Sequence, residues 1–457
     1  MSPLARCIVH SPNIVVAAGE PPSLGTGYKR NVLASIWTPL TLYPATASST
    51  TNMKVVTAVL LLAEAVSAFP WVPQVPGVDS SMLVERQQPG TGPGSEATCP
   101  FNARHVNAAP ITTRFPYNGA INGTKGKERG GFRVPAVGDN DHRYIAPTAT
   151  DIRGPCPGLN TAANHNFLAR DGITTYKELV DAQQNVYNVG YDLANLLAFL
   201  GLQADGDLVT QKLSIGCDAT GRTSFNRVLT GSQPGLVGHN KFEGDTSLTR
   251  NDFFLGKGDN FRFNTTLFAS MTRTTGANYN LQGLAKYRKQ RWVESQRDNP
   301  NFFFGPLSLL LFGAASFLYE LFPNGNRGYR PDFATITSFF VQEKLPDNWV
   351  NRVEPYDNNR VTQEILKMYL LAPVEFGGNT APGSFNALPR NFGAIRNGKI
   401  SPSITPAETS CLLYQLATGQ VPSTLNSVVT PTVEALAFFA QFVAPSFGNL
   451  GCPNPLT

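Results

Sequence analysis

The sequence lacks the features by which nucleic-acid-binding and membrane proteins are usually recognised. Its 37 Lys and Arg residues nearly balance 32 Asp and Glu residues in a chain of 457. No cluster of basic residues is interleaved with aromatic ones, so nothing indicates a nucleic-acid surface. One apolar run, residues 306–322, is shorter than a bilayer requires and carries Glu320 near its end. We interpret this run as a buried core helix.

The usual signatures of zinc enzymes and serine hydrolases are also missing. The sequence contains neither an H-E-x-x-H array nor the G-x-S-x-G turn of α/β-hydrolases. No two cysteines have the spacing of zinc ligands. We therefore interpret His165 as a residue that makes a structural hydrogen bond. The histidines and cysteines are His10, His105, His142, His165, His239, Cys7, Cys99, Cys156, Cys217, Cys411 and Cys452.

Strand patterns are scarce, because apolar and polar residues rarely alternate with period two. Apolar residues instead recur at helical spacing, and internal repeats are absent. The sequence therefore predicts a mainly α protein with a single compact multi-helix domain, and its 41 Gly and 35 Pro residues predict many turns and long irregular connections. Helices are expected over about 157–170, 175–204, 208–215, 281–298, 306–322, 333–343, 361–371 and 430–444.

The N-terminal part is predicted to contain a signal peptide at residues 53–68. Met53-Lys54 gives it a charged start, an apolar stretch follows, and Val66-Ser67-Ala68 resembles a small-residue cleavage site. Residues 1–52 are either a genuine extension or an upstream stretch wrongly joined to the reading frame, and we favour the second interpretation. Residues 69–150 are predicted to form an irregular N-terminal arm, and residues 151–457 the folded domain.

These features predict a secreted, extracellular protein without a membrane anchor after cleavage. The sequons at Asn122 and Asn264 are then expected to be glycosylated. Export also favours a disulfide between Cys411 and Cys452, which flank the last predicted helix. Cys99 and Cys217 are either paired or free.

The most informative stretch is Gly154-Pro-Cys-Pro-Gly-Leu-Asn160. Proline is favoured as the first residue of a helix, so Pro157 places Cys156 at the N-cap. Gly172 suits the left-handed position after the end of this helix. A sulfur at a helix N-terminus meets free backbone N–H groups and the positive end of the helix dipole, which lower the thiol pKa. Cys156 is therefore a candidate thiolate ligand of iron, with a buried free thiol or a disulfide as the alternatives.

The segment Asp151–Asn160 closely resembles the haem-binding segment of the fungal haem-thiolate peroxidases, the family of chloroperoxidase and the unspecific peroxygenases. The resemblance implies that Cys156 is the axial ligand of haem b. It also implies an enzyme that uses hydrogen peroxide to insert oxygen into small aromatic or aliphatic compounds, or to oxidise them. Halide oxidation is a close variant of this chemistry.

A second motif, Phe242-Glu-Gly-Asp-Thr-Ser247, extends the resemblance. On its own, this motif would be a solvated acidic turn. It is similar to the Glu-Gly-Asp motif of the long peroxygenases, which binds magnesium against a haem propionate. The resemblance implies that Glu243, Gly244 and Ser247 supply oxygen ligands to a structural Mg²⁺. It also implies that Phe242 lines the substrate pocket.

The resemblance is incomplete at the group that moves a proton during peroxide cleavage. The long members use a glutamate with an arginine seven residues before it. Glu320 is the only acid in the equivalent stretch, but Gly313 stands at the arginine position. We expect Glu320 to be catalytic, because an apolar helix raises the pKa of a carboxyl group. A solvent-facing glutamate at a helix end is the alternative.

Two other functions remain compatible with these motifs. One is a dedicated oxidation step in the synthesis of a secondary metabolite. The other is a secreted, non-catalytic protein that has kept the fold, which the missing arginine leaves open. Haem content separates this last alternative from the enzymes.

Overall fold

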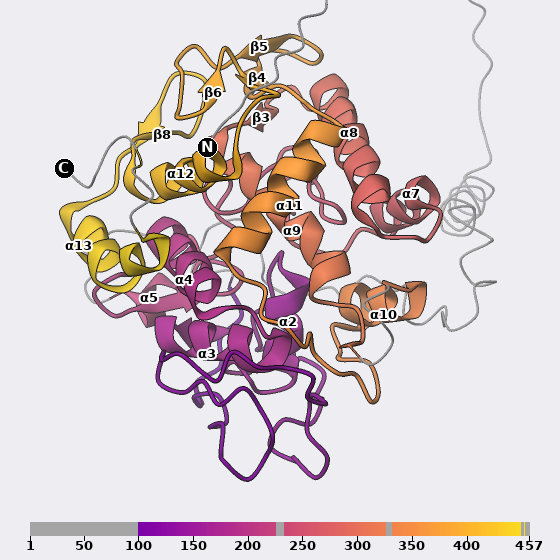
Figure 1. Ribbon diagram of the computed structural model, residues 1–457, viewed down its shortest axis with the longest axis vertical. Coiled ribbons are helices and arrows are strands. Elements are labelled where there is room, and N and C mark those ends of the chain that lie inside the picture. Colours follow the sequence, from indigo (N-terminus) through magenta and orange to yellow (C-terminus); the bar gives the residue numbers. More distant parts are fainter. Residues whose placement is uncertain (1–98, 225–232, 326–330, 449–451, 453–457) are drawn as a thin grey trace, which may run out of the picture. The chain divides into compact units, whose positions relative to one another are not determined.

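The computed structural model describes residues 99–224, 233–325, 331–448 and 452. They all belong to the second of the chain's two units, residues 64–457. The predicted extension at 1–52, the predicted signal peptide at 53–68 and the first part of the predicted arm lie outside the described residues. The described part is mainly helical, as predicted, with a few short strands (Figure 1).

One group of helices packs around α9 (Leu310–Glu320), which contacts α8 (Leu281–Asp298) and α11 (Asn358–Leu371). Helices α7 (Thr265–Thr275) and α12 (Pro406–Thr418) pack on the outer sides of α8 and α11. A Cβ atom at Gly313 would come within 3.3 Å of side-chain atoms of Val361 and Ile365. The missing side chain of Gly313 therefore lets α9 and α11 approach closely.

A second group contains α3 (Tyr176–Tyr187) and α4 (Tyr191–Asp205), which pack on each other, and α13 (Val433–Phe442), which packs on α4. As predicted, α3 begins with a capping box. The Glu178 N–H donates to Thr175 Oγ1 at 3.2 Å, and the Thr175 N–H donates to Glu178 Oε2 at 3.0 Å. Asn188 then adopts a left-handed conformation with φ 55°, so the single long helix predicted over 175–204 is in fact two helices.

The cysteine helix, α2 (Pro157–Asn164), is shorter than predicted. Asn166 takes the left-handed position, with φ 61°, and the Phe167 N–H donates to the Ala162 carbonyl at 2.9 Å. This arrangement ends the helix at His165 rather than near Arg170, because asparagine tolerates the left-handed region better than most residues. Gly172 also has a positive φ, but it leads into a strand.

The helix predicted over 208–215 is wrong. Residues Lys212–Ser214 form β2, which pairs antiparallel with β1 (Ile173–Thr175). A partner strand about 40 positions earlier in the chain overrides the local pattern. The other strands are β3 (Phe303–Phe304), β4 (Gly377–Asn379), β5 (Phe385–Ala387), β6 (Ile395–Arg396), β7 (Lys399–Ile400), β8 (Val421–Pro422) and β9 (Val428–Val429).

The remaining helical elements are short or irregular. The predicted helix 306–322 is a 3₁₀ turn, η4 (Pro306–Leu309), followed by α9. The predicted helix 333–343 is α10 (Phe333–Thr337) followed by a π turn, η6 (Ser338–Gln342). Helices α7 and α12 were not predicted. The other elements are α5 (Thr220–Thr223) and η7 (Ala444–Phe447).

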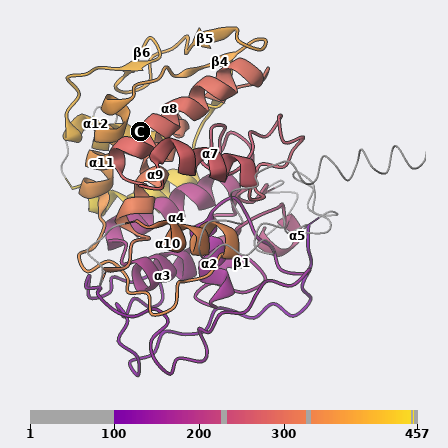
Figure 2. The same cartoon turned by 90° about the vertical axis from the view of Figure 1, so that its right-hand side faces the viewer.

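Residues 99–150 contain no helix and form the loops at the lower end of Figures 1 and 2. Three backbone N–H groups of this segment donate to side chains of α3. The acceptors are Asn185 Oδ1 for Gly119, Asp181 Oδ1 for Gly123 and Gln184 Oε1 for Gly126, at 2.9, 3.0 and 3.0 Å. The polar face of α3 therefore holds this irregular segment in place.

Two disulfides are present in the described residues. Cys99 pairs with Cys217, and Cys411 pairs with Cys452. The first bond settles the choice that the sequence left open, and the second joins α12 to the chain beyond α13. No helix in the described ranges combines the length and apolarity needed to cross a membrane.

We expect the double variant Cys411→Ser/Cys452→Ser to be less stable than the wild type. The bond closes a segment with a sequence separation of 41, and loop-closure entropy of that size corresponds to about 4 kcal/mol. Guanidinium unfolding of the secreted protein measures the difference. Equal midpoints and slopes for the two proteins would show that the bond adds no stability.

Candidate active site

The candidate site begins at Cys156, the N-cap residue of α2. Its thiol is free, whereas the other four cysteines of the described part form disulfides. The residue remains partly accessible to solvent, although it lies deep in the protein. The thiol is therefore held at the N-terminus of α2 without a disulfide partner.

Burial raises the pKa of the Cys156 thiol, and this effect outweighs the groups that lower it. Those groups are the backbone N–H groups of Leu159 and Gly158 and the charge of Arg250. The expectation that the helix N-terminus favours a thiolate is therefore only partly right, because desolvation dominates. A metal ion that displaces the proton would supply the compensating charge.

The loop before α2 is held by side chains from two directions. Asn160 Oδ1 accepts a hydrogen bond from the Gly154 N–H at 2.9 Å, and Asn160 Nδ2 donates to the Gly154 carbonyl at 2.8 Å. Tyr187 donates to the Gly158 carbonyl at 2.7 Å. These bonds restrict the backbone on both sides of Cys156.

Arg250 links the cysteine helix to the Glu-Gly-Asp loop. It is 1% exposed, and its Nη2 lies 3.6 Å from Glu343 Oε1. The same Glu343 oxygen accepts a hydrogen bond from Asn160 Nδ2 at 2.7 Å. Arg250 stands three residues after Ser247, so a charged network joins the two motifs. Arg250 was not predicted as a site residue, because its only signal in the sequence is its place just after the second motif.

The Glu-Gly-Asp loop contains a buried carboxylate, that of Glu243, whose charge is not fully balanced by hydrogen bonds or by a neighbouring cation. Glu243 Oε2 lies 3.1 Å from His239 Nδ1, while Oε1 accepts no hydrogen bond of standard geometry from the described residues. Burial raises the pKa of Glu243 well above its usual range, and burial lowers that of His239. Asn260 and the Asn240 N–H act on this carboxylate and lower its pKa by less than burial raises it. A buried carboxylate of this kind has capacity for a cation.

The other residues of the loop have separate roles. Asp245 Oδ2 accepts from the Phe303 N–H at 3.2 Å, which ties the loop to β3. The Ser247 carbonyl accepts from Arg291 Nε at 3.1 Å. Within the described ranges, no three His, Cys, Asp or Glu side chains are grouped as a metal site. The ligand set implied by the resemblance contains only one such side chain, that of Glu243, together with the Gly244 carbonyl and the Ser247 hydroxyl.

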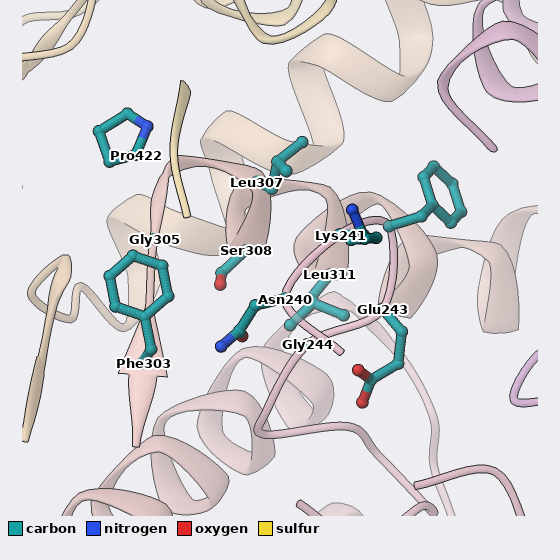
Figure 3. Close-up of a pocket in the computed structure, with 11 residues that line it drawn as sticks. Asn240, Lys241, Glu243, Gly244, Phe303, Gly305, Leu307, Ser308, Leu311 and Pro422 are labelled. Atoms are coloured by element: carbon teal, nitrogen blue, oxygen red, sulfur yellow. The ribbon is translucent and has the colours of Figure 1, made fainter. Parts of the chain in front are cut away.

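A small hollow lies beside this loop (Figure 3). Phe242, Glu243 and Gly244 of the loop line it, together with Ser308 of η4 and Leu311 at the start of α9. The implied pocket residue Phe242 and the implied ligands Glu243 and Gly244 are neighbours in the chain and share this lining, whereas Ser247 is not part of it. The other lining residues are Asn240, Lys241, Phe303, Gly305, Leu307 and Pro422.

Glu320 lies at the opposite end of α9 from Leu311 and is not among the residues that line the hollow. It forms an ion pair with Arg352, whose Nη1 also donates to the Glu320 carbonyl at 3.1 Å. The arginine that the helix itself lacks is therefore supplied by the segment before α11. This partner was not predicted, because it lies 32 positions away in sequence.

Burial raises the pKa of Glu320, and the charge of Arg352 opposes this shift. Glu364 raises it further. The charged groups that act on Cys156 are different ones, Arg250 and Glu343. The structure gives Glu320 a raised pKa, as expected, but it does not show shared contacts between Glu320 and the cysteine site.

The remaining candidate residues differ in accessibility. Asn122 is exposed, whereas Asn264 caps α7 by accepting from the Leu267 N–H at 3.0 Å.

His165 is structural, as predicted. Its Nδ1 bonds to the His142 carbonyl at 2.9 Å, its Nε2 accepts from the Leu345 N–H at 3.1 Å, and burial lowers its pKa to about 4.

Comparison with known proteins gives a consistent result. Residues 142–354 match the family described as "Peroxidase, family 2". An aromatic peroxygenase of Coprinellus radians is 37% identical over 228 residues, which are 47% of this chain and 85% of the relative. An aromatic peroxygenase of Cyclocybe aegerita is 32% identical over 321 residues, 67% of this chain and 81% of the relative.

A third relative is a dothistromin biosynthesis peroxidase of Dothistroma septosporum. It is 30% identical over 351 residues, which are 68% of this chain and 82% of the relative. All three matches cover most of the relative's length. The chain therefore belongs to peroxidase family 2, the fungal haem-thiolate peroxidases.

Proposed function

We propose that this protein is a secreted haem-thiolate peroxygenase that uses hydrogen peroxide to oxygenate or oxidise small aromatic compounds. The observation that carries the proposal is the free Cys156 at the N-cap of α2 in a chain that belongs to the haem-thiolate peroxidases. When bound, haem b would supply an iron centre that peroxide can oxidise, and a thiolate from Cys156 would favour cleavage of the O–O bond.

The residues of the chain have distinct roles in this proposal. Cys156 binds the iron, and Asn160 and Tyr187 hold the backbone on which its sulfur is presented. Glu243, Gly244 and Ser247 bind a structural Mg²⁺. The buried Glu243 Oε1, which accepts no hydrogen bond of standard geometry from the described residues, supports this assignment. Phe242 forms part of the wall of the substrate pocket.

Glu320 is proposed to accept a proton from peroxide and return it to the leaving oxygen. Its ion pair with Arg352 favours the ionised form, which is the form able to accept a proton. The partial burial of Glu320 keeps its pKa raised, so that it can also give the proton back.

Spectroscopy and product analysis test the proposed function together. The purified, secreted protein should show a Soret band and a thiolate-type ferrous–CO band. It should also transfer ¹⁸O from labelled peroxide into a hydroxylated product of naphthalene. A protein that binds no haem would instead favour the non-catalytic alternative.

A second candidate is a dedicated oxidation of one secondary metabolite, which the similarity to the dothistromin biosynthesis peroxidase favours. The range of substrates that the protein converts distinguishes these two candidate functions. A peroxygenase of broad range converts unrelated aromatic probes at comparable rates, whereas a biosynthetic enzyme converts few of them. Chlorination of a β-diketone probe tests for halide oxidation.

Secretion forms part of the proposal. The two disulfides support an oxidising compartment, and the leader at residues 53–68 supports export with cleavage after Ala68. Glycosylation is proposed at Asn122, which is exposed, and at Asn264.

Replacement of the Glu243 carboxylate is expected to weaken the binding of Mg²⁺. We expect Glu243→Gln to bind Mg²⁺ at least about 10-fold more weakly, because a neutral amide replaces the only charged protein ligand. Elemental analysis of the purified protein measures the metal content, and thermal unfolding with and without EDTA measures its effect on stability.

The control for this experiment is Glu354→Gln, which removes an exposed carboxylate elsewhere. It should keep its magnesium content and its response to EDTA. Equal metal content in Glu243→Gln and the wild type would show that the loop does not bind the cation.

A further inference from the structure

Glu343, the residue directly after the π turn η6, has an unusual backbone conformation. Its φ of 49° lies in the left-handed region, which side chains other than those of asparagine and aspartate seldom adopt. Such a conformation persists only where the surrounding contacts fix it, and π turns and residues of this kind are frequent at functional sites. The contacts of Glu343 therefore indicate what it does.

The cysteine helix α2 supplies these contacts. The Glu343 carbonyl accepts a hydrogen bond from Asn164 Nδ2 at 2.9 Å, and Glu343 Oε1 accepts one from Asn160 Nδ2 at 2.7 Å. The two asparagines are one helical turn apart, and neither is more than 1% exposed. Both the backbone and the side chain of Glu343 are thus bound to the helix that begins after Cys156.

The Asn160 amide connects Glu343 to the turn that carries the cysteine. Pro155 and Pro157 flank Cys156 and have no N–H group, so the turn can form few backbone hydrogen bonds of its own. Asn160 clamps it instead, because its Oδ1 accepts from the Gly154 N–H and its Nδ2 donates to the Gly154 carbonyl. The second hydrogen of Nδ2 is directed at the Glu343 carboxylate, which can only accept. Glu343 therefore favours the one orientation of the amide that holds Gly154 from both sides.

Glu343 also carries a charge close to the candidate thiolate. Its side chain is 13% exposed, and that of Arg250, 3.6 Å away, is 1% exposed. Burial has the largest influence on the pKa of the Cys156 thiol, but Arg250 also lowers that pKa and Glu343 raises it. Removal of the carboxylate would leave the buried Arg250 without this partner.

We propose that Glu343 is a positioning residue for Cys156. Its carboxylate holds the Asn160 amide that clamps the Gly154–Pro157 turn, and its charge balances Arg250 beside the sulfur. The inference rests on the proposed function, because the turn it describes presents the proposed iron ligand. Glu343 takes no part in the chemical step.

Two substitutions at this position separate the hydrogen bond from the charge. Glu343→Gly removes the side chain and suits the left-handed backbone. Glu343→Gln keeps an acceptor oxygen but has no charge. In the haem-loaded protein, Glu343→Gly should exchange the Gly154 amide hydrogen about 10-fold faster than the wild type, the effect of losing one hydrogen bond. Part of its ferrous–CO complex should also lose the thiolate-type band, whereas Glu343→Gln should keep both properties.

The reduction potential of the haem measures the charge. Glu343→Gln removes a negative charge and leaves Arg250 without its acidic partner, which favours the reduced, less positive iron. The equilibrium constant for one-electron reduction should rise about 10-fold, or about 59 mV. A purely structural role would leave the potential of this variant unchanged. An unchanged potential in Glu343→Gln would thus overturn the proposed effect of the charge, even if Glu343→Gly did not fold.

Glu128→Gly is the matched control. Glu128 is also a glutamate with a left-handed backbone, φ 50°, but its side chain is 35% exposed and pairs with Lys125 at 2.8 Å. This variant should keep the wild-type exchange rate at Gly154, the thiolate-type band and the potential. A change in these properties like that in Glu343→Gly would mean that they do not depend on the contact with Asn160, and the proposal would be wrong.

The exchange rate at Gly154 decides the positioning role. Wild-type exchange and a wild-type ferrous–CO spectrum in Glu343→Gly would contradict it. Equally fast exchange in Glu343→Gly and Glu343→Gln would show that the acceptor oxygen does not hold the clamp. A secreted protein without haem would contradict the proposed function instead, while exchange at Gly154 would still test whether Glu343 holds the turn.

Discussion

The Cys156→Ala variant is expected to lose the thiolate-type ferrous–CO band and all peroxide-driven oxygenation. A methyl group cannot bind iron, and no other free cysteine stands in the described part of the chain to replace it. Optical spectra of the dithionite-reduced, CO-treated protein and oxygenation of naphthalene measure the two losses. A variant that kept the wild-type spectrum would show that Cys156 is not the ligand.

Cys156→His serves as the matched substitution at the same position. Imidazole can bind haem iron but does not donate electron density as a thiolate does. We expect this variant to retain haem, to lose the thiolate-type band and to shift from oxygen insertion toward one-electron oxidation. Unchanged guanidinium unfolding of both variants without haem would show that the losses do not come from misfolding.

The second large effect is expected for Glu320→Gln. The amide has nearly the same size as the carboxyl group but cannot carry the proton. The rate at which peroxide oxidises the haem should therefore fall by roughly 10²–10⁴, the range for a lost general acid–base group. Haem content and the ferrous–CO spectrum should not change. Stopped-flow absorbance after mixing with hydrogen peroxide measures the rate.

The raised pKa of Glu320 also predicts the direction in which the rate of haem oxidation changes with pH. A group that must first accept a proton works in its ionised form, which is present above its pKa. Since burial raises the pKa of Glu320, the wild-type rate should fall as the pH is lowered through that raised value. Glu320→Gln should lack this acid limb.

A neighbouring carboxyl group provides the control. Glu364 accepts a hydrogen bond from Tyr319 at 2.8 Å and lies near Glu320. Glu364→Gln should keep a rate close to that of the wild type. If Glu320→Gln and Glu364→Gln both react like the wild type, another residue moves the proton. Ser308, which lines the hollow, would then be the next candidate.

Local signals in the sequence determined the points at which several helices begin. The capping box at Thr175 and Glu178 starts α3, and Pro157 starts α2 directly after Cys156. The two motifs that carry the family resemblance are also short, contiguous stretches. Features of this kind depend on residues within one or two turns of each other, so they can be predicted without knowledge of the fold.

Only the tertiary structure decided the features that depend on residues distant in sequence. The segment 208–215 became a strand because β1 lies beside it. Glu320 gained Arg352 as its partner, and Cys99 was joined to Cys217 across a separation of 118. Arg250 connects the two motifs only once both are folded against Glu343. The chain must be packed before such groups meet, since the free energy of each contact depends on burial and on partners that local patterns do not reveal.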